Sequence, residues 1–232
     1  MSSAVQGDID IAAAAALMAE PARTAMLQAL LDGGTLPSGE LARRAQVAAS
    51  TASEHLKRLL AGGFVIREVA GRERRYRLAS PAVAEALESL ARVALPGQVL
   101  SLRGATRAEA IRTARTCYDH IAGRLGVGLT EALIARGALV EHASSYGLTD
   151  SGERLLASLG VDVAAARERR RSFARACIDW SERRPHLAGA LGAALADALL
   201  ARAWVLRRPA DRGLQITAIG RTELARLGVE LG

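Results

Sequence analysis

Two short segments of the sequence combine cysteine with aspartate and histidine, residue types that can bind metal ions. The first segment is Cys117-Tyr-Asp-His120, and the second is Cys177-Ile-Asp-Trp180, followed by His186. Thiolate, imidazole and carboxylate groups are ligands for zinc, nickel and similar ions. The sequence therefore offers a metal site, with the following candidate ligands: Cys117, Asp119, His120, Cys177 and His186.

Other roles for these residues stay open. Asp119 or His120 could cap a helix, and each cysteine could be a small buried apolar side chain. A cleft in this region could instead hold a small-molecule effector. Catalysis would need a nucleophile, a base and an orienting group in one cleft, which the spacing of Cys117 and His120 does not show. We therefore expect no enzyme and assign no catalytic residue.

The candidate ligands lie in an internal duplication. The stretch 120–136 recurs at 186–202, an offset of 66 residues. Each copy predicts a helix, a short hairpin and a helix, so residues 104–232 are expected to form two winged-helix-like repeats, about 104–163 and 172–232. If the copies pack about a pseudo-twofold axis, His120 and His186 occupy matching positions and the cysteines approach one pocket.

A basic segment separates the two copies. Arg167–Arg175 contains five arginines, and we expect it to be helical. It would form either a solvated face or a contact with DNA beside the main interface.

The first part of the chain predicts a series of helices. Half of the residues are hydrophobic and only 3% are aromatic, which favours many small helices over a large sheet. After a disordered start at residues 1–7, helices are expected at Ile9–Met18 and Pro21–Leu31. The expected fold class is mainly α with small β-hairpin wings (α+β), with a first domain at residues 8–97.

Two further helices in this domain form a helix-turn-helix. Ser38–Arg44 and Ser50–Leu60 are joined by a tight connection at residues 45–47, and the second helix has an apolar stripe. Strands at Phe64–Val69 and Arg75–Leu78 then predict a hairpin, or wing. A last helix, Ala82–Leu95, is expected to stop at Pro96-Gly97.

The charge pattern points to double-stranded DNA as a partner. Residues 37–78 carry nine basic residues against four acidic ones. The second helix of such a motif lies in the major groove, and a wing can reach phosphates or the minor groove. The expected DNA-binding residues are Ser50, Thr51, Ser53, Glu54, His55, Lys57, Arg58, Arg72, Arg74 and Arg75. For His55, a packing role is equally open.

The segments 17–31 and 39–79 resemble the ArsR/SmtB family of metalloregulators and their relatives. The most specific part is S-T-x-S-x-H-L-x-x-L at Ser50–Leu59, followed at the right spacing by G-R-x-x-x-Y at Gly71–Tyr76. The resemblance covers about residues 10–95. It implies a homodimer formed through the first helix and the Ala82–Leu95 helix, which binds a palindromic operator and represses transcription.

The family's familiar metal sites do not transfer to this sequence. The helix at Ser38–Arg44 has no cysteine, and Ala82–Leu95 offers only Glu85 and Glu88 as ligands. Any effector is therefore expected to bind the duplicated second domain. The alternative function is a protein-interaction scaffold of tandem winged helices without nucleic-acid contact.

The remaining composition bears on the compartment. Two cysteines are too few for a disulfide framework, no secretory leader precedes the globular sequence, and no apolar run reaches the roughly 20 residues of a membrane span. We expect a cytoplasmic protein with no membrane partner.

Overall fold

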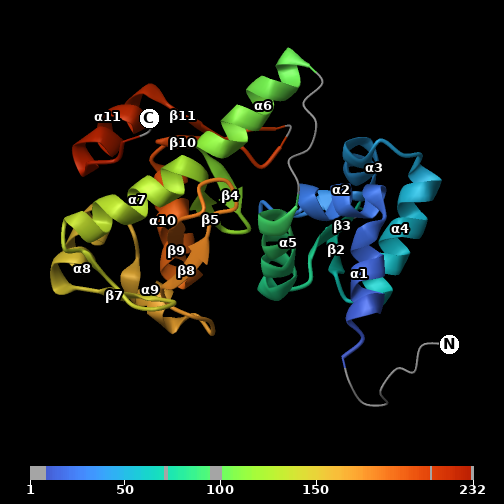
Figure 1. The fold of residues 1–232 in the computed structure, drawn as a ribbon, viewed down its shortest axis with the longest axis horizontal. Helices are drawn as coiled ribbons and strands as arrows, with labels where there is room; N and C mark the ends of the chain where they lie inside the picture. The colour runs from blue at the N-terminus through green and yellow to red at the C-terminus, as the bar shows by residue number, and fades with distance from the viewer. Residues whose placement is uncertain (1–8, 71–72, 95–100, 210, 231–232) are drawn as a thin grey trace. The chain divides into compact units, whose positions relative to one another are not determined.

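The computed structural model describes residues 9–70, 73–94, 101–209 and 211–230 (Figure 1). Its contacts divide the chain into two compact units, Met1–Leu87 and Glu88–Gly232. The expected disordered start at residues 1–7, the wing residues Gly71 and Arg72, and the Pro96-Gly97 stop lie outside the described residues. No helix in the described part of the chain has both the length and the apolar character needed to cross a bilayer.

The predicted elements of the first part are present in order. They are α1 (Ile11–Ala19), α2 (Pro21–Ala29), α3 (Ser38–Ala45), α4 (Ala49–Ala61), β2 (Val65–Ala70), β3 (Glu73–Leu78) and α5 (Pro81–Val93). The sequence did not predict the short strand β1 (Leu36–Pro37), which pairs antiparallel with β3 and completes a three-stranded sheet of order β1-β3-β2.

The first two helices are fixed by capping. Asp10 accepts a hydrogen bond from the Ala13 N–H at the start of α1, and Glu20 accepts one from the Arg23 N–H at the start of α2. The buried Arg23 guanidinium donates to the carbonyl oxygens of Ala16 and Leu17 at the end of α1. Arg23 thus satisfies carbonyls that a helix end leaves without intrahelical partners.

The connection between α3 and α4 is the predicted tight turn. Gln46 ends α3 in the left-handed conformation, with φ 55°, and the Val47 N–H donates to the Ala42 carbonyl at 3.1 Å. Leu41 on α3 and Leu56 on α4 are buried. This packing orients α4 so that its other face points outward.

The second unit contains two copies of one pattern. The first comprises α6 (Leu102–Thr113), β4 (Arg115–Cys117), β5 (His120–Ala122), α7 (Gly123–Ala135), β6 (Leu139–Glu141), β7 (Tyr146–Leu148) and α8 (Asp150–Ser158). The second comprises α9 (Val163–Glu168), β8 (Arg175–Ile178), β9 (Pro185–Ala188), α10 (Gly189–Ala201), β10 (Val205–Arg207), β11 (Leu214–Ile216) and α11 (Ala218–Leu227).

Each copy has the expected helix, hairpin and helix, and also an earlier hairpin that the sequence analysis missed. These extra hairpins are β4–β5 and β8–β9, whose strands have three or four residues. That the copies are winged-helix-like stays a prediction.

The extra hairpins lie between the two copies. Strand β5 packs against α10 as well as α7, and β9 packs against α7 as well as α10. In addition, the Thr116 N–H of the first copy donates to the Arg212 carbonyl of the second at 2.9 Å, and the Ala176 N–H of the second donates to the Ser144 carbonyl of the first at 3.0 Å. Buried side chains of both copies form one hydrophobic core. The second unit is therefore one folded body rather than two independent repeats.

The prediction that Arg167–Arg175 is a helix was wrong beyond its first residues. Helix α9 ends at Glu168, and Arg175 begins β8. Arg171 is drawn inward, where its guanidinium pairs with Asp119 and donates to the Gly189 carbonyl at 2.8 Å. The segment therefore has no continuous basic helix face, because Arg175 pairs within the β8–β9 hairpin and Arg171 contacts Asp119 and Gly189.

Candidate functional site

The outward face of α4 is polar, as a DNA-reading helix requires. Ala52, Leu56 and Leu59 are buried against the first unit. The exposed side chains of α4 include the following predicted DNA contacts: Ser50, Thr51, Ser53, Glu54, Lys57 and Arg58. Apart from His55, the structure places every predicted contact on this helix in solvent.

Helix α4 begins without a side-chain cap. The residue at its N-cap is Ala48, which has no group to accept from the backbone N–H groups of the first turn. Helix α3 begins in the same way after Pro37. Such N–H groups, together with the helix dipole, favour a bound anion such as a phosphate.

His55 faces the protein instead of solvent. Its Nε2 lies 3.5 Å from Oε2 of Glu20, and only 15% of its side chain is exposed. Of the two roles left open for His55, the structure favours packing.

Of the three wing arginines predicted to contact DNA, the two that the structure describes, Arg74 and Arg75, have different environments. Arg75 is held by the segment before β1, since its Nε donates to Thr35 Oγ1 at 2.9 Å and its Nη2 donates to the Thr35 carbonyl at 2.8 Å. Arg74 is exposed. Arg67 on β2 is also exposed and was not predicted as a contact, because it lies apart in sequence from the arginines that cluster at the hairpin turn.

Basic side chains near the α4 face are left without acidic neighbours. In the described residues, no carboxylate pairs with Lys57, Arg58, Arg67 or Arg74, whereas Arg43 on α3 pairs with Glu40. Solvent-exposed cations without internal partners are available to neutralise DNA phosphates.

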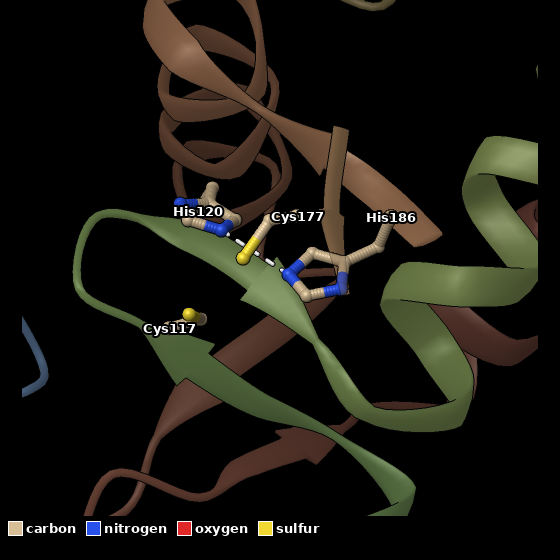
Figure 2. A group of neighbouring side chains, drawn as sticks. All are labelled: Cys117, His120, Cys177 and His186. Carbon is tan, nitrogen blue, oxygen red and sulfur yellow. Dashed lines mark hydrogen bonds between the residues drawn. The ribbon is translucent and has the colours of Figure 1, made fainter. Parts of the chain in front are cut away.

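The second unit brings together four of the five metal-ligand candidates. One possible ligand atom from each of Cys117, His120, Cys177 and His186 lies within 4.8 Å of the others, and all four residues are buried (Figure 2). Figure 2 shows the sulfur of Cys177 between the two imidazole rings, with the sulfur of Cys117 facing the same space. Asp119 is not in this group.

The extra hairpins position these side chains. Cys117 on β4 is the cross-strand partner of His120 on β5, and Cys177 on β8 is the partner of His186 on β9. Directly opposed residues of an antiparallel pair project to the same face of the ribbon. Each hairpin thus presents one cysteine and one histidine to the other hairpin.

A sequence signal for this equivalence was missed. The pattern A-R-x-C-x-D occurs at 114–119 and again at 174–179, an offset of 60 residues, whereas the histidines are offset by 66. The second hairpin has a connection six residues longer between Asp179 and His186 than the first has between Asp119 and His120. Aligning the hairpins on their cysteines would have shown that Asp119 and Asp179 match.

Each aspartate lies beside the histidine of its own copy. Oδ1 of Asp119 is 3.3 Å from Nδ1 of His120, and Oδ2 of Asp179 is 3.7 Å from Nδ1 of His186. The two Nε2 atoms face each other at 3.1 Å. Nδ1 therefore points toward a carboxylate in both rings, and Nε2 points into the cysteine-histidine cluster.

The aspartates are anchored by the opposite copy. Asp179 accepts from Arg115 Nη2 at 2.9 Å and from the Gly123 N–H at 2.6 Å, and Asp119 pairs with Arg171. The Gly123 contact also contradicts the helix-capping interpretation of Asp119 and His120. The N-cap of α7 is Ala122, and the carboxylate at this helix start comes from Asp179.

The electrostatics of the cluster favour one thiolate. A hydrogen bond from Cys117, together with the contacts to both histidines, lowers the pKa of the Cys177 thiol despite its burial. The same hydrogen bond and burial raise the pKa of Cys117. Burial lowers the pKa of His186, whereas for His120 the contacts to Asp119 and Cys177 outweigh burial and raise the pKa.

Comparison with known proteins places the first unit in a regulator family. A family model described as a helix-turn-helix domain matches residues 18–68. The chain is 39% identical over 212 residues to the uncharacterized HTH-type transcriptional regulator YdfF of Bacillus subtilis (strain 168), covering 91% of this chain and 94% of YdfF. The HTH-type transcriptional regulator CmtR of Mycobacterium tuberculosis is 41% identical over 78 residues, which are 34% of this chain and 65% of CmtR.

Solved structures resemble only part of the chain. The NMR structure of the cadmium metal-sensor CmtR from Mycobacterium tuberculosis has a TM-score of 0.33 and 35% identity, covering 39% of this chain and 94% of that one. NolR from Sinorhizobium fredii has a TM-score of 0.33 and 27% identity, covering 35% of this chain and 81% of NolR. The near full-length match to YdfF, by contrast, extends over both units. The chain belongs to the HTH-type transcriptional regulators, and its second unit carries an internal sequence duplication.

Proposed function

We propose that this chain is a homodimeric repressor that reads a palindromic DNA operator through α4 and responds to an effector bound in its second unit. The observation that carries the proposal is the outward face of α4. It presents small polar side chains at the uncapped start of the helix and unpaired cations further along.

Different parts of the α4 face would contact the DNA bases and the DNA phosphates. An α-helix fits the major groove, about 12 Å wide, with its first residues nearest the base edges. Ser50 and Thr51 occupy that position, while Lys57 and Arg58 lie about two turns later, where we expect them to meet the phosphate backbone. Arg74 on the wing adds a cation outside the helix. Base contacts specify the sequence, whereas phosphate contacts add affinity for any duplex.

Exposed apolar side chains support a homodimer. Helix α1 has no buried residue, and its Ile11 is 73% exposed. On α5, Leu90 and Val93 are 46% and 79% exposed. The resemblance to the ArsR/SmtB family implies dimerisation through these two helices, and a second copy of the chain would remove their apolar surface from water.

Fluorescence anisotropy against duplexes selected from a random library tests the proposal. We expect affinity to fall steeply with salt, because each phosphate contact contributes about −0.9 to the slope of log K against log salt concentration. The Arg74→Ala variant should weaken all duplexes alike and reduce the slope by about one. Thr51→Ala should instead change the ranking of operator variants, by about 1–3 kcal/mol at the contacted base pair. Arg154→Ala, which removes an exposed arginine of α8, is the matched control and should change neither.

Two results would overturn this function. Absence of salt-dependent duplex binding at any sequence would favour the protein-interaction scaffold instead. Equal losses for Thr51→Ala and Arg74→Ala on every duplex would refute the division between base contacts and phosphate contacts. In a purified transcription assay, the protein should lower transcript yield from a promoter that overlaps the selected operator.

A further inference from the structure

We propose that Cys117, His120, Cys177 and His186 bind one divalent transition-metal ion of the zinc class, and that this ion is the effector of the regulator. The first half of the proposal concerns the second unit alone. The second half rests on the proposed DNA-binding function.

The spacing of the ligand atoms matches a tetrahedral site. An ion with Zn–N bonds of about 2.05 Å and Zn–S bonds of about 2.3 Å holds two nitrogens about 3.3 Å apart and two sulfurs about 3.8 Å apart. The Nε2 atoms of His120 and His186 are already 3.1 Å apart, and all four candidate atoms lie within 4.8 Å of one another. Small side-chain rotations are enough to close the ligands around one ion.

A carboxylate lies near Nδ1 of each imidazole, at hydrogen-bond distance for His120 and at 3.7 Å for His186, whose buried Nδ1 has no hydrogen-bond partner among the described residues. Metal-bound histidines usually donate their second ring N–H to a carboxylate or carbonyl, which sets the tautomer and the ring plane. Asp119 and Asp179 lie beside the Nδ1 atoms of His120 and His186 respectively. With both Nδ1 atoms protonated, the lone pairs of the two Nε2 atoms face each other. A cation bound between the two Nε2 atoms would accept both lone pairs.

The backbone is shaped to bring the histidines together. Gly126 on α7 and Gly192 on α10 are equivalent positions, and the Cβ of the opposite copy's histidine lies close to each. A Cβ added at Gly126 would be 3.6 Å from that of His186, and one at Gly192 would be 3.3 Å from that of His120. Each added Cβ would also collide with a backbone carbonyl, at 2.3 Å and 2.6 Å respectively. Glycine at both positions thus permits each helix to pack closely on the hairpin of its own copy, directly beside the histidine of the other copy.

The chemistry of the ligand set selects the ion. Two thiolates and two imidazoles in a buried tetrahedron suit zinc and its analogues cobalt and cadmium, whereas calcium and magnesium prefer oxygen ligands. Four protein ligands leave no open position, so the site is of the closed kind and not of the kind that activates water. Because each copy supplies two ligands, the ion would link the β4–β5 hairpin to the β8–β9 hairpin, and its loss would destabilise the second unit.

Cobalt titration of the full-length protein tests the site directly. The protein is stripped with a chelator and kept reduced, and Co²⁺ is added while visible absorption is followed. We expect saturation at one equivalent, intense tetrahedral d–d bands, a thiolate charge-transfer band and displacement by Zn²⁺. The His142→Gln variant changes an exposed histidine outside the cluster and should bind normally. His186→Asn and Cys177→Ser should each lose the tetrahedral spectrum, and circular dichroism shows whether they remain folded.

A milder variant keeps the test decisive if a ligand variant fails to fold. Asp119→Asn retains all four ligands, so it should keep the spectrum while the affinity for Co²⁺ falls about 10- to 100-fold. Absence of tetrahedral Co²⁺ in the reduced wild-type protein would overturn the site. So would a disulfide between the cysteines that forms in air and is unaffected by prior loading with Zn²⁺.

The effector role has its own readout. Operator affinity is measured with and without one equivalent of Zn²⁺, and we expect a change of about 5- to 150-fold, the usual range of coupling between sites. Metal binding with unchanged operator affinity would refute the effector role and leave the site intact. Metal binding without any duplex binding would refute the proposed DNA-binding function instead.

Discussion

Replacing Asp179 with asparagine is expected to destabilise the second unit strongly. The side chains of Asp179 and Arg115 both have no exposed surface, and the two groups are 2.9 Å apart. Asparagine keeps the shape of the side chain and can still accept from the Gly123 N–H, but it leaves the Arg115 guanidinium buried without a counter-charge. Removal of one partner from a buried ion pair costs about 3–5 kcal/mol of unfolding free energy.

The equivalent position in the other copy supplies the control. Asp119 and its partner Arg171 retain 27% and 26% of their side-chain exposure, so water can replace much of the lost contact. For Asp119→Asn we therefore expect a loss of only about 0.2–1 kcal/mol. The same chemical change at two matching positions should differ in cost by about 2 kcal/mol or more.

Tryptophan fluorescence during urea unfolding measures both variants. The only two tryptophans of the sequence, Trp180 and Trp204, lie in the second unit, so their emission reports on that unit alone. Trp180 is also a local reporter, because the Arg115 guanidinium lies 4.6 Å from its ring centroid. The measurement is made with a chelator so that metal binding does not contribute. Equal losses at Asp119 and Asp179 would refute the argument that burial of the ion pair sets the cost.

Three further predictions test other parts of the molecule. Arg75→Ala removes the two hydrogen bonds to Thr35 and should lower the stability of the first unit by about 1–3 kcal/mol, measured by circular dichroism, without changing the salt slope of DNA binding. Gly192→Ala places a Cβ 2.6 Å from the Leu187 carbonyl oxygen, so it should cost about 1–3 kcal/mol in urea unfolding and also weaken Co²⁺ binding in the spectroscopic titration. Val93→Asp puts a charge on an exposed apolar site of α5 and should shift analytical ultracentrifugation profiles from dimer to monomer. An unchanged free energy of unfolding for Arg75→Ala or Gly192→Ala would contradict the importance of the Thr35 hydrogen bonds or of the close helix packing, respectively. An intact dimer for Val93→Asp would contradict dimerisation through α5.

The elements of the first unit could be predicted because their signals are local. The apolar spacing at Ala52, Leu56 and Leu59 and the turn before α4 are visible in the sequence, and both correspond to structure. The inward position of His55 was not predictable in the same way. It depends on Glu20, which lies 35 residues earlier and meets it only after α2 and α4 have packed.

The residues of the cysteine-histidine cluster could be predicted from the sequence, but their spatial arrangement could not. Cysteine and histidine are rare in this chain, so Cys117, His120, Cys177 and His186 stood out by type. Their meeting depends on contacts between the hairpins of the two copies, which no local sequence pattern encodes. Asp119 was predicted as a ligand because a carboxylate can bind metal ions and lies in the same short segment as Cys117 and His120. In the structure it supports the ring instead, a role that only the three-dimensional arrangement reveals.

Because both copies lie in one polypeptide, matching positions can carry different residues. In a symmetric dimer, any substitution appears twice and both halves of a shared site change together. Here Thr130 of α7 accepts the Leu187 N–H at 2.8 Å, while the matching position of α10 is Ala196. Only one of the two aspartates forms a fully buried ion pair. Because the copies are fused, the Asp179 ion pair can be fully buried while the Asp119 ion pair stays partly exposed to solvent. Two identical subunits could not differ in this way.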